Sequence, residues 1–145
     1  MAQYDTALIA GQLCGLPNSP EKACFMPGRL TREPHASSEI AGVLNLRGRI
    51  VTVVDMRARL GLPKADDGKP PMAVGVDQRG ESYGLLIDQI GEVLRLPDDG
   101  REDNPVNLDP QLARVSAGVH RLEGSLLVVL DVDRVLDVGS RAEAA

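Results

Sequence analysis

The sequence predicts an all-β fold, mostly strands with short helical turns, made of two small β-barrels related by an internal repeat. The first observation behind this prediction is the repeat itself. Residues 118–137 align with residues 42–61 without a gap, and seven of the twenty positions are identical. The second is that short β-rich runs are separated by turns containing glycine, with few helical segments between them. A repeated half that holds four or five strands indicates two barrels packed face to face.

The strands are predicted from β-rich runs that occur in pairs. In chain order they cover residues 7–17 (with a turn at Gly11), 40–46, 49–54, 72–76, 82–87, 113–122 and 125–130. The turns at residues 47–48 and 77–81 contain glycine, as β-hairpins require. Ile90, Val93 and Leu94 have helix-like spacing, so we expect a helical segment there. Residues 96–110 read as an acidic loop.

Each copy of the repeat ends in a short helical turn that begins after an aspartate. Asp55 precedes residues 56–60, and Asp131 precedes residues 132–136. An aspartate before a helix caps free backbone N–H groups, which is the interpretation we favour. Two acids at equivalent positions can also serve acid–base catalysis, so a hydrolytic role stays open as an alternative.

The repeat covers nearly the whole chain. A second alignment, with a shift of 69 positions, places Gly15-Leu16 on Gly84-Leu85. We therefore expect one domain over residues 7–137, with repeat halves at about 7–63 and 72–137 and a polar boundary between them. Residues 138–145 are expected to form a flexible tail.

The composition excludes several classes of protein. Apolar residues make up 43% of the 145 residues and aromatic residues 2%, so the core must consist of Leu, Val and Ile. The net charge is −5, and residues 71–145 carry seven basic and fourteen acidic side chains. This acidic half, without aromatic stacking platforms, argues against nucleic acid as a partner.

The sequence also predicts the cellular location of the protein and the state of its two cysteines. The N-terminal residues lack the features of a signal peptide, and the apolar runs are too short to insert into a membrane, so we expect a cytoplasmic protein. Cys14 and Cys24 are expected to be free and buried. No metal-ligand spacing, phosphate-binding loop or catalytic motif is present, so we expect no metal, no cofactor and no catalytic residue.

The Arg47-Gly48 turn is the leading candidate for a functional site. Hairpin tips favour Gly, Asn and Asp, so turn geometry does not call for arginine. The matching residue of the second copy is Glu123, which indicates that the turn tolerates either charge. Arg49 and Arg57 likewise occur in the first copy alone. The alternative interpretation is a set of solvated surface charges.

Residues 40–62, IAGVLNLRGRIVTVVDMRARLGL, resemble the signature of the CheW family of chemotaxis coupling proteins. The specific parts are Asn45-Leu46-Arg47-Gly48 and Asp55-x-Arg57, and residues 83–88 and 122–131 also match the family pattern. The resemblance covers roughly residues 7–137. It implies two SH3-like five-stranded β-barrels and a non-catalytic adaptor.

The resemblance also implies the partners and the site. The expected partners are the regulatory domain of a CheA-type histidine kinase and the cytoplasmic tip of a chemoreceptor. Partner binding in the family involves the turn that matches Asn45, Arg47 and Gly48. With their neighbours, the candidate partner-binding residues are Asn45, Leu46, Arg47, Gly48, Arg49 and Arg57.

One segment, residues 17–25, departs from the family pattern. Asn18 and Glu21 stand where the second half has Ile87 and Ile90. Burying either polar side chain unpaired would cost on the order of a few kcal/mol, so the segment must be exposed or rearranged. The first alternative is therefore an adaptor dedicated to a non-chemotaxis or specialised kinase pathway. The second is a small-ligand-binding or hydrolytic β-barrel that uses Asp55 and Asp131.

Overall fold

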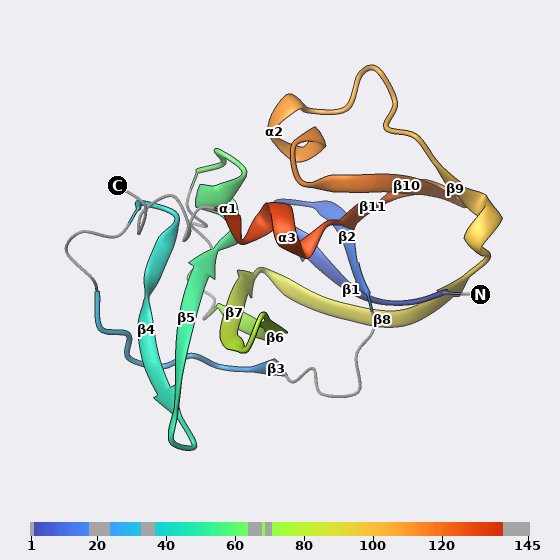
Figure 1. The fold of residues 1–145 in the computed structure, drawn as a ribbon. Helices are drawn as coiled ribbons and strands as arrows, with labels where there is room; N and C mark the ends of the chain where they lie inside the picture. The colour runs from blue at the N-terminus through green and yellow to red at the C-terminus, as the bar shows by residue number, and fades with distance from the viewer. Residues whose placement is uncertain (1, 18–23, 33–36, 64–67, 69–70, 138–145) are drawn as a thin grey trace.

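The computed structural model describes residues 2–17, 24–32, 37–63, 68 and 71–137, which form two sheets joined by short helices (Figure 1). The strands are β1 (Ala2–Ile9), β2 (Gln12–Pro17), β3 (Cys24–Phe25), β4 (Ile40–Leu46), β5 (Arg49–Asp55), β6 (Met72–Gln78), β7 (Glu81–Ile87), β8 (Gln89–Leu96), β9 (Arg101–Glu102), β10 (Ser116–Leu122) and β11 (Ser125–Leu130). The helices are α1 (Met56–Arg59), the 3-10 turn η1 (Asp98–Gly100), α2 (Pro110–Ala113) and α3 (Val132–Val135). The predicted all-β class with two subdomains is confirmed.

Two sheets define the subdomains. The six-stranded sheet has the order β8-β1-β2-β11-β10-β9, and the five-stranded sheet has the order β3-β6-β7-β5-β4. The sixth strand, β9, pairs Glu102 with Val119 of β10. The isolated bridge between Thr31 and Val43 occupies the equivalent place in the other sheet. The two subdomains therefore follow one plan and differ most at the opposite edge, where β8 has eight residues and β3 has two.

Residues 90–94 belong to β8, so the predicted helical segment is wrong. β8 pairs antiparallel with β1, and this pairing extends along the whole strand. Thr6 Oγ1 of β1 donates a hydrogen bond to the Glu92 carbonyl at 2.6 Å. A Cβ on Gly91 would lie 2.4 Å from the same hydroxyl oxygen, so β1 and β8 approach closely there. Pairing with a distant strand outweighs helix-like spacing in a short apolar run.

Each sheet combines strands from both halves of the repeat. β1 and β2 lie in the sheet that contains β8–β11, whereas β6 and β7 lie beside β5 and β4. Parallel pairing joins the halves in each case: Val53 lies opposite Gly84, and Val129 lies opposite Gly15. The sequence repeat aligns Val53 with Val129 and Gly15 with Gly84, so the two pairs are equivalent. The halves thus exchange their first hairpins.

The predicted repeat and domain limits are not tested by these sheets. The limits of 7–63 and 72–137 for the halves, and of 7–137 for the domain, stay a prediction. Most of the predicted boundary segment, and the predicted tail at residues 138–145, lie outside the described residues.

Glycine recurs at Gly42 and Gly118 because a second strand crosses there. The φ angles are +155° and +134°, in the range that favours glycine, and both residues lie at register shifts in their hairpins. A Cβ on Gly42 would lie 2.8 Å from the Thr31 carbonyl oxygen, and one on Gly118 would lie 2.9 Å from that of Glu102. A side chain at either position would therefore push the crossing segment away.

The two helical turns lie near the middle of the molecule, between the sheets (Figure 1). Asp55 accepts hydrogen bonds from the backbone N–H groups of Arg57 and Ala58, and Asp131 accepts one from that of Arg134, so the capping interpretation is confirmed. The buried core that these turns help to build takes side chains from both sheets and includes Ile9, Leu16, Val54, Met56, Leu85, Val119, Val128 and Val135.

Candidate partner-binding site

The β4–β5 hairpin carries the predicted site away from the core, and its turn projects at the lower end of the molecule in Figure 1. Arg47 and Gly48 form the turn, with φ angles of +54° and +82°. Asn45 Oδ1 accepts a hydrogen bond from Gly48 N at 2.9 Å, which holds the turn. Arg47 is exposed and Leu46 is half-buried opposite Arg49. The tip is thus a protruding, locally braced loop.

Arg47 adopts a backbone conformation that arginine disfavours. The left-handed region costs a residue with a Cβ about 1–2 kcal/mol relative to the ordinary helical region. Three residues other than glycine have positive φ in the described part of the chain: Ala10, Arg47 and Arg79. Glu123 is not one of them, so the two matching tips share their glycine but differ in the residue before it. The sequence-based interpretation that Arg47 and Glu123 occupy the same turn conformation is therefore wrong. The left-handed conformation at position 47 disfavours arginine.

Arg49 and Ile50 flank the turn on β5. Arg49 Nη2 lies 3.7 Å from Asp77 Oδ1, and both side chains are largely exposed. Ile50, opposite Asn45 in the hairpin, is 64% exposed. Sequence reasoning missed Ile50, although strand alternation could have found it, because the residues one and three positions later face the core. The tip therefore presents an exposed apolar side chain in addition to Arg47 and Arg49.

Arg57 makes its contacts inside the protein. Its Nε and Nη2 atoms donate to the two carboxylate oxygens of Asp88 at 2.9 and 2.5 Å, and Nη1 donates to the Pro63 carbonyl at 3.0 Å. Asp88 also accepts a hydrogen bond from Ala10 N at 2.8 Å. The hydrogen bond from Arg57 is the main reason that the pKa of Asp88 lies below its ordinary value. Partner binding by Arg57 stays a prediction, but its guanidinium already links α1 to the β7–β8 corner.

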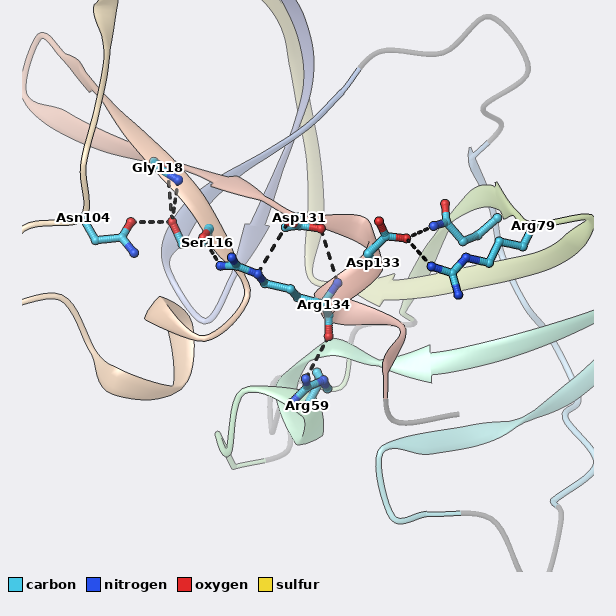
Figure 2. Close-up of polar contacts among 9 residues, drawn as sticks. Arg59, Arg79, Asn104, Ser116, Gly118, Asp131, Asp133 and Arg134 are labelled. Atoms are coloured by element: carbon cyan, nitrogen blue, oxygen red, sulfur yellow. Dashed lines mark hydrogen bonds and ion pairs between the residues drawn. The ribbon is translucent and has the colours of Figure 1, made fainter. Parts of the chain in front are cut away.

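Arg59 of α1 reaches the other helical turn, as Figure 2 shows. It donates to the carbonyl oxygens of Arg134 at 2.9 Å and Val135 at 3.2 Å, at the end of α3. Arg134 in turn donates to the Ser116 carbonyl at 3.1 Å. The second copy of the repeat has Val135 at the position of Arg59. The first copy alone therefore supplies the arginine that joins the two helical turns.

The remaining sequence-based expectations concern cysteines, metals and membranes. Cys14 is buried and Cys24 is exposed, and neither is in a disulfide, so the expectation of burial is wrong for Cys24. Within the described ranges, no three His, Cys, Asp or Glu side chains are grouped to hold a metal ion. Over the same residues, no helix combines the length and apolar character that crossing a membrane requires.

Comparison with known proteins assigns the family. A family model for the CheW-like domain matches residues 3–139, so the chain belongs to the CheW-like domain family. The chemotaxis protein CheW of Rhizobium meliloti is 28% identical over 114 residues, which is 79% of this chain and 74% of that protein. The CheW protein of Bacillus subtilis is also 28% identical over 114 residues, which is 79% of this chain and 73% of that protein.

A solved structure shares the fold. The crystal structure of the scaffolding protein TtCheW from Thermoanaerobacter tengcongensis superposes with a TM-score of 0.76 at 23% sequence identity. The match covers 89% of this chain and 83% of that one. The arrangement of two β subdomains is therefore that of a known protein.

Proposed function

We propose that this chain is a non-catalytic cytoplasmic adaptor that couples chemoreceptors to a CheA-type histidine kinase in chemotaxis signalling. Membership of the CheW-like domain family supports this proposal, as do relatives named chemotaxis protein CheW. The expected contacts are the regulatory domain of the kinase and the cytoplasmic tip of the receptor. The partner-binding residues proposed are those of the hairpin tip, namely Asn45, Leu46, Arg47, Gly48 and Arg49, together with Arg57.

The observation that carries the proposed site is the conformation of Arg47. Arg47 is exposed, and its left-handed backbone conformation costs the fold about 1–2 kcal/mol. Strained residues of this kind gather at functional sites. Ile50, exposed on β5 opposite Asn45, supplies apolar area of the kind that interfaces bury.

Arg47→Asn tests the site with a substitution that the turn favours. Asn suits the left-handed region, so this variant should unfold at the same or a slightly higher temperature than the parent. An exposed charge pair contributes about 0.2–1 kcal/mol, so the affinity for the kinase regulatory domain or the receptor tip should fall about 1.4- to fivefold. Titration calorimetry at low and high salt measures both the affinity and the electrostatic part of it.

Arg79→Asn is the matched control. Arg79 also precedes a glycine at a hairpin tip, with a φ of +52°, and the substitution removes the same charge. Its guanidinium lies 4.0 Å from Asp133 Oδ1, so it serves a different place on the molecule. Equal losses of affinity in both variants would show that only the net charge matters, and would refute the assignment of Arg47 to the partner-binding site.

The alternatives stand differently against the structure. The specialised pathway depends on residues 17–25, of which residues 18–23 lie outside the described part of the chain. The hydrolytic alternative depends on Asp55 and Asp131, whose carboxylates accept hydrogen bonds from the helical turns that follow them. No observation therefore favours either alternative over the adaptor.

A further inference from the structure

A cavity of about 330 Å³ is lined mainly by residues of the six-stranded sheet and of α3. It lies beside the first residues of β1, the end of β11 and the start of α3. The exposed Ala117 and the half-buried Val132 form its accessible apolar part, over the buried Val129 and Leu130. Gln78 of β6 also lines it, so the cavity sits where the two sheets meet. Its volume is at the lower end of the range for ligand pockets and suits one or two side chains.

Two hydrogen-bond donors of this cavity have no acceptor among the described residues. Tyr4 is 95% buried, since its exposed fraction is 5%, and its ring packs against His120 at a centroid distance of 5.6 Å. The Tyr4 hydroxyl makes no hydrogen bond in the described part of the chain and is not among the buried atoms without a partner, so it reaches solvent at the cavity that Tyr4 lines. Arg101 has no carboxylate within 4 Å there, and its aliphatic stem lies across Gly118. A buried phenol and an unpaired guanidinium both favour an acceptor that carries negative charge.

The carboxylates of the cavity already have partners. Asp131 lies 3.6 Å from Arg134 Nε, as Figure 2 shows. Asp133 accepts a hydrogen bond from Gln78 Nε2 and lies 4.0 Å from the guanidinium of Arg79. Among the described lining residues, Arg101 is therefore the charged group without a counterion. The cavity is complementary to an apolar group attached to a carboxylate.

We propose that this cavity is a second docking site, which takes an acidic side chain and a neighbouring apolar side chain from a partner protein. The carboxylate accepts hydrogen bonds from the Tyr4 hydroxyl and the Arg101 guanidinium, and the apolar side chain packs on Ala117 and Val132. The inference rests on the proposed adaptor function, because a protein that bridges two partners needs a second surface besides the hairpin tip. No residue of the hairpin tip lines the cavity, so the two surfaces are made of different residues.

Short capped peptides test the site without kinase or receptor. The probe is acetyl-Leu-Glu-amide, titrated into the isotope-labelled protein while amide chemical shifts are followed; acetyl-Leu-Gln-amide is the matched neutral peptide. We expect shifts centred on residues 2–4, 101, 117 and 129–132 with the acidic peptide, and affinity at least about fivefold weaker with the neutral one.

Two variants locate the contacts. Arg101→Gln should weaken the acidic peptide about tenfold, and Tyr4→Phe about two- to fivefold, because Phe keeps the ring that packs against His120. Arg121→Gln is the control, since Arg121 is an exposed arginine on the same sheet that pairs with Glu102 at 3.2 Å. That variant should bind the peptide as the parent does.

The outcomes separate this site from the proposed function. Equal binding of the two peptides, shifts outside the cavity, or equal effects of Arg101→Gln and Arg121→Gln would each overturn the docking site. None of these results depends on the kinase or the receptor. If Arg47→Asn leaves both partners bound as tightly as before, the proposed tip fails while the peptide result stands.

Discussion

The Arg57–Asp88 pair separates a structural from a partner-binding role for one predicted site residue. In Arg57→Met, the fold loses two hydrogen bonds to a carboxylate and one to the Pro63 carbonyl. The side chains are 21% and 26% exposed, so the pair lies between a surface pair of about 0.2–1 kcal/mol and a buried one of about 3–5 kcal/mol. We expect the free energy of unfolding to fall by about 2 kcal/mol.

The assay is thermal or urea unfolding of the whole chain. For a protein of this size, a loss of about 2 kcal/mol lowers the unfolding temperature by roughly 4–8 °C. Asp88→Asn should lower it by a similar amount, and the double variant should lose less than the sum of the two. A coupling energy of about 1–2 kcal/mol between the two sites would report their direct contact.

The pH dependence gives a second readout of the same pair. The pKa of Asp88 is lower in the folded protein than in the unfolded chain. A carboxyl group of this kind contributes stability above its unfolded pKa, near 3.9, and that contribution is lost as the pH falls through the folded value. The difference in stability between the parent and Arg57→Met should therefore shrink below about pH 4. If Arg57→Met unfolds like the parent but binds partners less tightly, Arg57 is a partner contact and the structural reasoning is wrong.

Three further predictions concern the scaffold. In urea unfolding, Gly42→Ala should lower the free energy of unfolding by at least about 2 kcal/mol, because its Cβ would meet the Thr31 carbonyl. Gly48→Ala has open space around it and should lower this free energy by only about 1 kcal/mol. Equal losses in the two variants would count against the crossing contact. Asp55→Ala should lose about 1 kcal/mol through the missing cap, and Asp55→Asn should lose less than half of that; a larger loss in the Asn variant would contradict capping. Burial lowers the pKa of His120, whose Nε2 has no partner in the described part of the chain. The unfolded chain therefore binds the proton more readily, and stability should fall as the pH drops below about 6.5. His120→Phe should flatten this dependence of stability on pH, and an unchanged slope would assign the dependence to other groups.

Local chemistry made much of the scaffold predictable from sequence. Gly42 and Gly118 recur because a crossing strand leaves no room for a Cβ, and Asp55 and Asp131 recur because a helical turn needs a cap. Such requirements act within a few residues or at one contact, so they leave the same residue type at both copies of the repeat. The hairpins, the caps and the two-subdomain plan follow from them.

Long-range pairing explains what sequence reasoning could not reach. The strand partner of residues 89–96 is β1, more than eighty positions away, and helix-like spacing gave no sign of it. Arg57 belongs to the first copy alone, which indicated function, but its partner Asp88 lies 31 positions later. Tyr4 and Arg101 meet at one cavity only because β1 and β9 enter the same sheet. Neither residue stands in a pattern that could have identified it.

The exchange of hairpins between the halves has a consequence for how the chain folds. The six-stranded sheet cannot form from one contiguous segment, because β1 and β2 are separated from β8–β11 by all the strands of the other sheet, and the five-stranded sheet takes β6 and β7 from the second half. Pairings between distant residues raise the contact order, so we expect slow folding with both subdomains appearing in a single transition. A cut in the segment that joins the halves should therefore give two fragments that fold only together. A partner that binds one sheet should therefore raise the unfolding free energy of both, because the buried core takes side chains from both sheets.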